Sequence, residues 1–297
     1  MMSKYQLVSD YKHIKKYKES FNELAKLVFN LDFKEWYDKG CWNDNYICYS
    51  YIDGDKVIAN ASVNKMVVIC NGKEYKAIQV GTVMTHPDYR HKGLAARLIN
   101  TIIEKYETDY DFIYLFANDT VLDFYPKFGF EKVKESRFSL KTSDLKKQVL
   151  SKSTIRKLDS DNQADFELMK GFAAERIPVS STFGVKNNDQ LLLFYFIFVF
   201  NGATYYIEEE DTIVIVKQEE NKLHIFDILS KESVDLVRIL NHIVSANTQL
   251  MEFYFTPDSN SENIYTEIIT GSDDTLFVRP FIKDMPRHLL FPLTSHA

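Results

Sequence analysis

Residues 80–95 contain the residue types and spacing with the clearest chemical use. A β-rich run ends at Pro87, a cationic turn follows at Arg90-His91-Lys92-Gly93, and an amphipathic helix begins near Leu94. The first N–H groups of a helix have no intrahelical acceptor, and the helix dipole adds partial positive charge there. A glycine lets a ligand come close to the backbone. This turn is therefore predicted to bind an anion such as a pyrophosphate, with an ordinary capped turn as the alternative.

A second segment favours the anion-binding interpretation. Asn118 begins a short helix, and residues 125–130, Tyr-Pro-Lys-Phe-Gly-Phe, close it. If the strands that lead into the two segments are neighbours in a sheet, Tyr125 faces the same side as the turn. The alternative is that Tyr125, one of 18 tyrosines, only packs against the sheet.

These two segments resemble the GNAT superfamily of acyl-CoA N-acyltransferases. The family pattern Arg/Gln-x-x-Gly-x-Gly/Ala is matched by Arg90, Gly93 and Ala95. The family's Asn…Tyr-x-x-x-Gly-Phe ending is matched by Asn118, Tyr125, Gly129 and Phe130. The resemblance spans roughly residues 5–134 in element order. It implies an α/β (α+β) fold in which a mixed, mostly antiparallel sheet is flanked by helices.

The resemblance also implies a role for each matched residue. Acetyl-CoA would be the cosubstrate, and its acetyl group would pass by direct attack to a primary amine of a small molecule or peptide. Tyr125 would protonate the leaving thiolate, which a phenol can do because it is still protonated at neutral pH. The cofactor would be held by backbone groups of the acyl-binding strand, by main-chain N–H groups of the turn and by one residue beside it: Val83, Met84 and Thr85; Arg90, His91, Lys92, Gly93, Leu94 and Ala95; and Asn118.

The general base and the acyl group are left open by the sequence. His86 lies next to the acyl-binding strand and has a suitable intrinsic pKa, but it is equally a loop residue exposed to solvent. A carboxylate acting through water, or water itself, are alternatives. Cys70 is excluded as a nucleophile because no histidine accompanies it and buried cysteines are usually inert. Transfer of a longer acyl group, and a non-catalytic acyl-CoA sensor or interaction module, are the competing functions.

The elements that must position these residues follow from periodicity. Helical spacing covers residues 21–30, and β-rich runs at 46–52, 57–70 and 75–85 predict an antiparallel meander with turns at Gly54 and Gly72. A helix from Leu94 through Ile103, a strand at 112–116, a short helix at 120–127 and a strand from Phe130 complete the first half.

The order of elements recurs after a polar stretch at residues 142–157, which predicts two domains, at 1–145 and 152–297. The second has strands near 154–158, within 204–228 and at 251–256, and helices at 163–176, 190–200 and 234–246. Its counterpart of the anion-binding turn, residues 227–235, has no glycine and carries Glu232 and Asp235, which repel phosphate. It is therefore predicted not to bind coenzyme A.

This organisation resembles tandem GNAT proteins in which a silent second domain walls the acceptor cleft. A fainter resemblance is to the enhanced intracellular survival type of acetyltransferase, whose sterol-carrier-like further domain has no room in 297 residues. That difference leaves the oligomer open, with a homodimer as one option.

Composition limits the remaining function classes. A net charge of −6 and the absence of a long Lys/Arg run argue against nucleic-acid binding. Residues 191–200 are apolar but cover only about half of the ~20 residues that span a bilayer, so a buried helix is expected rather than a membrane anchor. Three scattered cysteines indicate reduced thiols with neither disulfide nor metal, and the N-terminus does not resemble a secretory signal, so a cytoplasmic location is expected.

Two further groups of side chains have both a functional and a structural interpretation. The aromatic residues Trp36, Tyr37, Trp42 and Tyr46 could line an acceptor pocket, although packing is the simpler expectation. The acidic run at residues 208–211 could draw a cationic amine toward the cleft, although a solvated turn is more usual.

Overall fold

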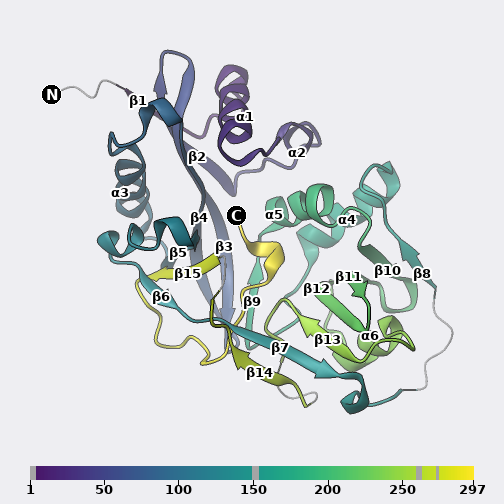
Figure 1. Ribbon diagram of the computed structural model, residues 1–297. Helices are drawn as coiled ribbons and strands as arrows, with labels where there is room; N and C mark the ends of the chain where they lie inside the picture. The colour runs from purple at the N-terminus through teal and green to yellow at the C-terminus, as the bar shows by residue number, and fades with distance from the viewer. Residues whose placement is uncertain (1–4, 149–153, 259–262, 272–273) are drawn as a thin grey trace.

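The computed structural model describes residues 5–148, 154–258, 263–271 and 274–297. Two mixed, mostly antiparallel sheets flanked by helices stand side by side (Figure 1), which confirms the predicted fold class. In the part of the chain so described, no helix is long and apolar enough to cross a lipid bilayer.

The first sheet has the order β1-β2-β3-β4-β5-β15-β6, with β9 paired to the far end of β3. All of its pairs are antiparallel except β4 with β5. Its strands are β1 Gln6–Ser9, β2 Tyr46–Asp53, β3 Lys56–Cys70, β4 Lys73–Thr85, β5 Phe112–Asn118, β6 Glu131–Val133, β9 Phe183–Lys186 and β15 Asp274–Arg279.

Helices cover both faces of the first sheet because its strands alternate apolar side chains. Helix α3, Leu94–Tyr106, buries Leu98 and Ile102 against one face, together with Ile78 and Val80 of β4. Helices α1, Lys15–Phe29, and α2, Lys34–Asp38, pack on the other face, where Met84 lies. The second half of β4, from Ala77, therefore lies between two packed layers, whereas residues 73–76 are mostly exposed.

The second sheet has the order β14-β7-β13-β12-β11-β10-β8. Its strands are β7 Ser136–Lys141, β8 Ile155–Lys157, β10 Thr204–Ile207, β11 Thr212–Glu219, β12 Lys222–Ser230, β13 Leu250–Phe253 and β14 Tyr265–Ile268. Its helices are α4 Gln163–Glu175, α5 Asp189–Phe194 with a π-helical turn at Tyr195–Val199, and α6 Leu236–Ile243. The parallel pair β12 and β13 is joined by α6, as β4 and β5 are joined by α3.

The two sheets exchange strands. β7, from the first half of the chain, lies in the second sheet, whereas β9 and β15, from the second half, lie in the first sheet (Figure 1). The predicted boundary at 145–152 therefore does not coincide with the division of the strands, and part of it, residues 149–153, lies outside the described residues. Short strands of this kind carry too little periodic signal to be assigned to a sheet from sequence.

Most predicted elements are confirmed within a few residues, but the single short helix predicted at 120–127 is wrong. Two 3₁₀ segments, Asp119–Val121 and Tyr125–Phe128, stand in its place. Pro126 has no N–H to extend a helix backward, and Gly129, with φ +77°, ends the second segment in the left-handed conformation. Tyr125 is therefore held at the first position of a tight turn rather than inside a regular helix.

The segment at residues 286–297 runs between the two sheets and reaches the first one (Figure 1). Phe291 stacks on Tyr114 of β5 with ring centroids 4.5 Å apart. The hydroxyl of Thr294 donates to Asp227 of β12, which also forms a buried ion pair with Arg176 at 2.6 Å. These contacts hold the segment in place so that Ala297 lies directly against Gly81 of β4.

Glu135, in the connection between β6 and β7, makes the stability of this arrangement depend on pH. Its Oε1 accepts a hydrogen bond from the backbone N–H of Phe291 at 2.9 Å. Burial, with a smaller contribution from the Asp274 carboxylate, raises the pKa of Glu135 to about 7. The folded state therefore holds this proton more tightly than the unfolded chain, and the associated stability is lost as pH rises from the unfolded pKa to about 7.

The substitution Glu135→Gln should stabilise the protein at pH 8 and have much less effect at pH 4.5. The amide keeps the acceptor for Phe291 but carries no charge, so the expected gain at pH 8 is up to about 3 kcal/mol. Urea unfolding of both proteins at the two pH values measures it. An equal difference at both pH values would show that the charge of Glu135 is not responsible.

Candidate active site

Strands β4 and β5 part at the end where the predicted site residues lie. Their parallel pairing runs from Ala77 with Phe112 to Val80 with Leu115 and stops there. Immediately afterwards β4 has a β-bulge, since its register against β3 shifts by one residue between Gly81 and Met84. A bulge bends and re-aims its strand, so residues 83–85 diverge from β5 and leave their backbone groups on that side without a strand partner.

Buried polar side chains hold this bulge. Thr82 has φ +48°, which is unusual for a β-branched residue and costs free energy. Its carbonyl accepts a hydrogen bond from Asn60 Nδ2 at 2.9 Å, and its hydroxyl lies 3.1 Å from that of Tyr46. Asn60 is itself fixed by Ser50 and Ser62. The strained conformation is thus maintained by a network built into β2 and β3.

The gap between the strands opens a cavity of about 400 Å³. Five predicted site residues line it, namely Val83, Thr85, Ala95, Asn118 and Tyr125, and Gly81, Phe116, Asp274 and Ala297 also contribute. Met84, also predicted, points instead into the core between the sheet and α1 and is 2% exposed. Its side chain cannot touch a ligand, which leaves only its backbone for the predicted role.

The turn before α3 presents unused hydrogen-bond donors. Throughout the described ranges, no acceptor is found for the backbone N–H groups of residues 91–96. Gly93 has φ +71°, and a Cβ placed on it would meet nothing within 4 Å. Since the helix dipole adds positive character to this end of α3, an anionic group can lie against the turn without obstruction.

The side chains of the turn contribute unequally. Lys92 donates from Nζ to the carbonyl of Asp88 at 2.8 Å and lies over the ring of Tyr89, so it stabilises the turn itself. Leu94 is buried in the core beneath α3. Arg90 and His91 are exposed, and His91 adopts φ +60°. The main chain therefore offers the groups that could hold an anion, and the side chain of Arg90 is exposed next to them.

Tyr125 faces the cavity from the second 3₁₀ segment. Its ring packs edge-on against Phe124 and Phe130 and tilts against Phe277 of β15, and only 5% of the residue is exposed. Burial raises its pKa to about 12. The phenol therefore keeps its proton at neutral pH and can act there as an acid but not as a base.

Residues 12–133 match the family model described as an acetyltransferase (GNAT) domain. This part of the protein is therefore similar to GNAT acetyltransferase domains. The turn before α3 and most residues that line the cavity lie within the matched range, whereas Asp274 and Ala297 lie outside it. A search of curated proteins by sequence found no match.

Solved structures share the fold along nearly the whole chain. A probable N-acyltransferase from Enterococcus faecalis matches with a TM-score of 0.59 at 16% identity, covering 93% of this chain and 72% of that one. Eis1 from Mycobacterium abscessus matches at 0.60 and 13% identity over 93% and 73%, and a GCN5-related N-acetyltransferase from Kribbella flavida at 0.54 and 16% over 93% and 71%. The similarity therefore includes both sheets and not only the GNAT domain.

The second sheet does not repeat the site of the GNAT domain. Asp235 caps α6 by accepting hydrogen bonds from the N–H groups of Val237 and Arg238, which occupies the donors that an anion would need. At the end of β12, Ile177 donates its N–H to the carbonyl of Ser230 at 2.9 Å and fills the place beside that strand. These contacts support the prediction that this half does not bind coenzyme A.

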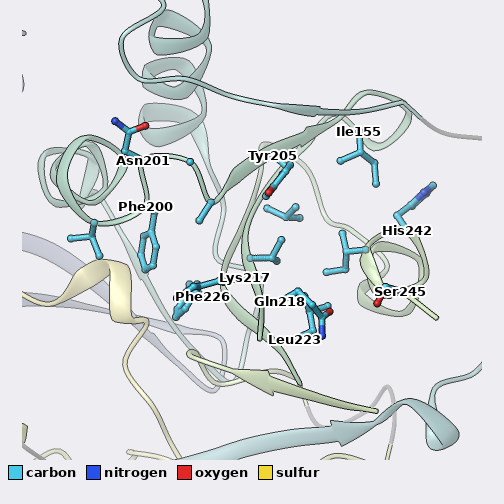
Figure 2. A pocket seen from close by; sticks show the side chains of 16 residues that line it. Ile155, Phe200, Asn201, Tyr205, Lys217, Gln218, Leu223, Phe226, His242 and Ser245 are labelled. Carbon is cyan, nitrogen blue, oxygen red and sulfur yellow. The ribbon is translucent and has the colours of Figure 1, made fainter. Parts of the chain in front are cut away.

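A larger cavity, about 730 Å³, lies on the second sheet and shares no lining residue with the first (Figure 2). Its walls come from residues 199–203, the strands β10 to β12 and the end of α6, with Phe200, Tyr205 and Phe226 among its side chains. His242, at one end, bonds to Glu210 at 2.9 Å. None of the predicted site residues contributes to it.

His86 and Cys70 are not placed to take part in chemistry. The two ring nitrogens of His86 are engaged by Lys56 Nζ at 3.0 Å and by the N–H of Asp88 at 3.3 Å, and the side chain does not line the cavity. Cys70 lies at the end of β3 and β4 that is opposite to the cavity. Burial raises the pKa of its thiol to about 12. Neither side chain lines the cavity.

For the aromatic group near residues 36–46 and the acidic run at residues 208–211, the structure favours the structural interpretation over the functional one. Trp36, Trp42 and Tyr46 are buried and pack edge-on or tilted against one another in the core rather than lining an open pocket. In the acidic run, Glu210 pairs with Arg238 and His242 of α6. Both groups stabilise the fold.

Sequence reasoning missed Gly81, Phe116, Asp274 and Ala297, and the last two come from the segment after residue 250, where no motif pointed to the site.

Proposed function

We propose that the protein is an N-acetyltransferase that transfers the acetyl group of acetyl-CoA to a primary amine of a small molecule or peptide. The observation that carries this proposal is the gap between β4 and β5 beside a turn whose N–H groups and Gly93 are open to an anion. A thioester arm and a pyrophosphate need these two features next to each other. Within the described ranges no cluster of His, Cys, Asp or Glu forms a metal site, and direct transfer needs none.

Each part of the cofactor has a counterpart in the site. The pantetheine arm lies along residues 83–85, whose backbone groups the bulge turns away from β5 and leaves available for amide hydrogen bonds. The pyrophosphate lies against the main chain of residues 90–95, beside Arg90. Asn118, on the opposite wall, is held by hydrogen bonds from the N–H and hydroxyl of Thr120 and borders the arm.

The reaction then proceeds without a covalent enzyme intermediate. The neutral amine attacks the thioester carbon, the C–N bond forms, and the C–S bond breaks as the tetrahedral adduct collapses. Tyr125 donates its proton to the departing sulfur, which it can do because its pKa is raised to about 12 and it remains a phenol. The nitrogen loses one proton and the sulfur gains one, so no net proton is released.

Residues 1–145 are proposed as the catalytic domain and 152–297 as a GNAT-like domain without a coenzyme A site that walls the acceptor cleft. Its contribution to the wall includes Asp274 and Ala297, which line the cavity. We place the protein in the cytoplasm, in keeping with three cysteines that are buried and unpaired.

The test is acyl transfer to a panel of amines. Purified protein with acetyl-CoA is given spermidine, tyramine, glucosamine or a short peptide with a free amino terminus, and free thiol is measured beside the mass of the amine. Transfer predicts equal amounts of thiol and of product 42 Da heavier for at least one class, with acetyl-CoA preferred to octanoyl-CoA. Binding of acetyl-CoA without product from any amine would favour the sensor, and a preference for octanoyl-CoA would correct the acyl group.

A further inference from the structure

The cavity of about 730 Å³ on the second sheet lies where β10 leaves β11. The pairing of these two strands ends at Thr204 and Ile215. Beyond that point β11 continues to Glu219 beside β12, and its other side has no strand partner among the described residues. Residues 199–203 lead into β10 at this place, so a space remains between them, the end of β11 and the end of α6.

An irregular helix end forms one wall of this space. Tyr195–Val199 is a π-helical turn, and Phe200 donates its N–H to the carbonyl of Tyr195 at 2.7 Å. Ala203 then closes a tight turn by donating its N–H to the carbonyl of Phe200 at 2.9 Å. π-Helical turns are rare and occur frequently at functional sites. The wall therefore points to a function at this place independently of the volume of the cavity.

The surface of the cavity is mainly apolar. The rings of Phe200 and Phe226 lie with centroids 4.5 Å apart, and Figure 2 shows Phe200 and His242 on opposite sides of the space. Ile155 and Val199 also line it, although they are 41% and 50% exposed. Exposed apolar side chains around a hollow mark a binding site, and small-molecule sites have volumes of about 300–1,000 Å³. The ligand therefore has an apolar body.

Several polar side chains of the wall already have partners. Gln218 accepts a hydrogen bond from the hydroxyl of Thr248 at 2.9 Å through Oε1, and its amide nitrogen donates to two backbone carbonyls. His242 Nε2 lies 2.9 Å from a carboxylate oxygen of Glu210. Since these groups are engaged within the protein, they give little recognition to a polar ligand body.

Lys217 gives the cavity a cation that a ligand can reach. It lies opposite His224 of β12, whose ring stacks with that of Phe226 at a centroid distance of 6.1 Å. Lys217 Nζ pairs with Glu219 at 2.6 Å, but the two side chains are 60% and 53% exposed, and such a pair contributes little stability. Among the described residues that line the cavity there is no Asp or Glu. A carboxylate of a ligand can therefore replace Glu219 as the partner of Lys217.

We propose that this cavity binds a small aromatic carboxylate, with its rings against Phe200 and Phe226 and its carboxylate paired with Lys217. Aromatic walls favour aromatic ligands because rings stack or meet edge to face. Lys217 disfavours a cationic amine, so the ligand differs in charge from the acceptor of the proposed reaction. The cavity shares no lining residue with the cavity between β4 and β5, and the inference therefore stands whether or not the protein transfers an acyl group.

Binding is tested by ligand-observed NMR titration of the wild-type protein with 1-naphthylacetate, its neutral amide and octanoate. The aromatic carboxylate should bind with a Kd of about 1 mM or tighter, and at least about fivefold more tightly than either of the other two. Saturating acetyl-CoA should leave this Kd unchanged. Absence of saturable binding, displacement by acetyl-CoA, or equal affinity for the amide or octanoate would overturn the proposal.

Three variants locate the ligand. Val199→Glu places a carboxylate at the rim of the cavity and should weaken 1-naphthylacetate at least about tenfold. Leu27→Glu is its matched control, because Leu27 is 55% exposed on α1 and does not line the cavity, and it should leave the Kd unchanged.

Lys217→Met removes an exposed charge and should lower the affinity for the carboxylate to that for the amide, with the amide unaffected. Circular dichroism of each variant reports whether it is folded. Equal weakening by Val199→Glu and Leu27→Glu, or wild-type affinity for the carboxylate in Lys217→Met, would show that the ligand does not bind in this cavity as proposed.

Discussion

Tyr125→Phe should lower kcat by about 10²–10³-fold while the Kd for acetyl-CoA changes by less than twofold. The phenol lines the cavity and keeps its proton because burial raises its pKa to about 12, so removing the oxygen removes the acid that protonates sulfur. Phenylalanine retains the packing against Phe124, Phe130 and Phe277. Steady-state kinetics with the best amine, beside calorimetric binding of acetyl-CoA, measures the two quantities separately.

The matched control for this variant is Tyr106→Phe. Tyr106 is buried in the same core cluster and loses a hydrogen bond to Tyr49 at 2.8 Å, but it does not line the cavity. Its kcat should stay within twofold of the wild type, although its stability should fall by about 1 kcal/mol. If Tyr125→Phe behaves like the control, Tyr125 is a packing residue and another acid must be sought. The assignment would also be contradicted if the wild-type rate fell as the pH rose with an apparent pKa below 10, because the phenol would then lose its proton too early.

Gly93→Glu should abolish binding of acetyl-CoA, with a loss in affinity of at least about 1000-fold. The space over Gly93 is empty in the protein, and its N–H belongs to the group of donors that have no protein acceptor. A carboxylate there both fills the space and repels the pyrophosphate. At a ligand concentration of 100 times the wild-type Kd, acetyl-CoA should raise the free energy of unfolding of the wild type by about 2.7 kcal/mol and that of the variant by less than about 0.1 kcal/mol.

Gly72→Glu separates this effect from backbone strain. Gly72 has φ +78° and, like Gly93, has nothing within 4 Å of an added Cβ, so the strain of a side chain at the two positions is similar. It lies in the turn before β4, at the end of that strand opposite the cavity. The control should lose stability without losing the response to acetyl-CoA. Equal loss of the response in both variants would show that general destabilisation, not the site, explains the result.

The sequence predicts a cofactor side of the site from signals that are local along the chain. The turn at residues 90–93, the helix that follows and Tyr125 are close together along the chain, and each residue type is required by a backbone conformation or a donor set that short motifs reveal. Met84 is predicted to act through its backbone, and the packing of its side chain against α1 is a detail that short motifs do not give. The bulge at Thr82 interrupts the alternation of side chains between the two faces of β4, and the sequence does not predict this bulge.

The acceptor side could not be predicted because it depends on contacts distant in sequence. β15 enters the first sheet between β5 and β6, and Asp274, at its start, reaches the cavity only through that pairing. Ala297 and His296 are brought to β4 and β5 by Thr294 on Asp227 and by Phe291 on Tyr114. Strands of three to six residues and an irregular segment have no periodicity from which such placements could be read.

The central claim is that β4, β5 and the turn before α3 form a single coenzyme A site. Calorimetric titration of the wild-type protein with acetyl-CoA tests this claim most directly. The structure predicts saturable binding with one molecule per chain, because the first sheet offers an open turn and the second has its corresponding helix capped by Asp235. Absence of binding would contradict the assignment of the cavity to acyl-CoA. Two molecules per chain would contradict the prediction that the second sheet lacks a site.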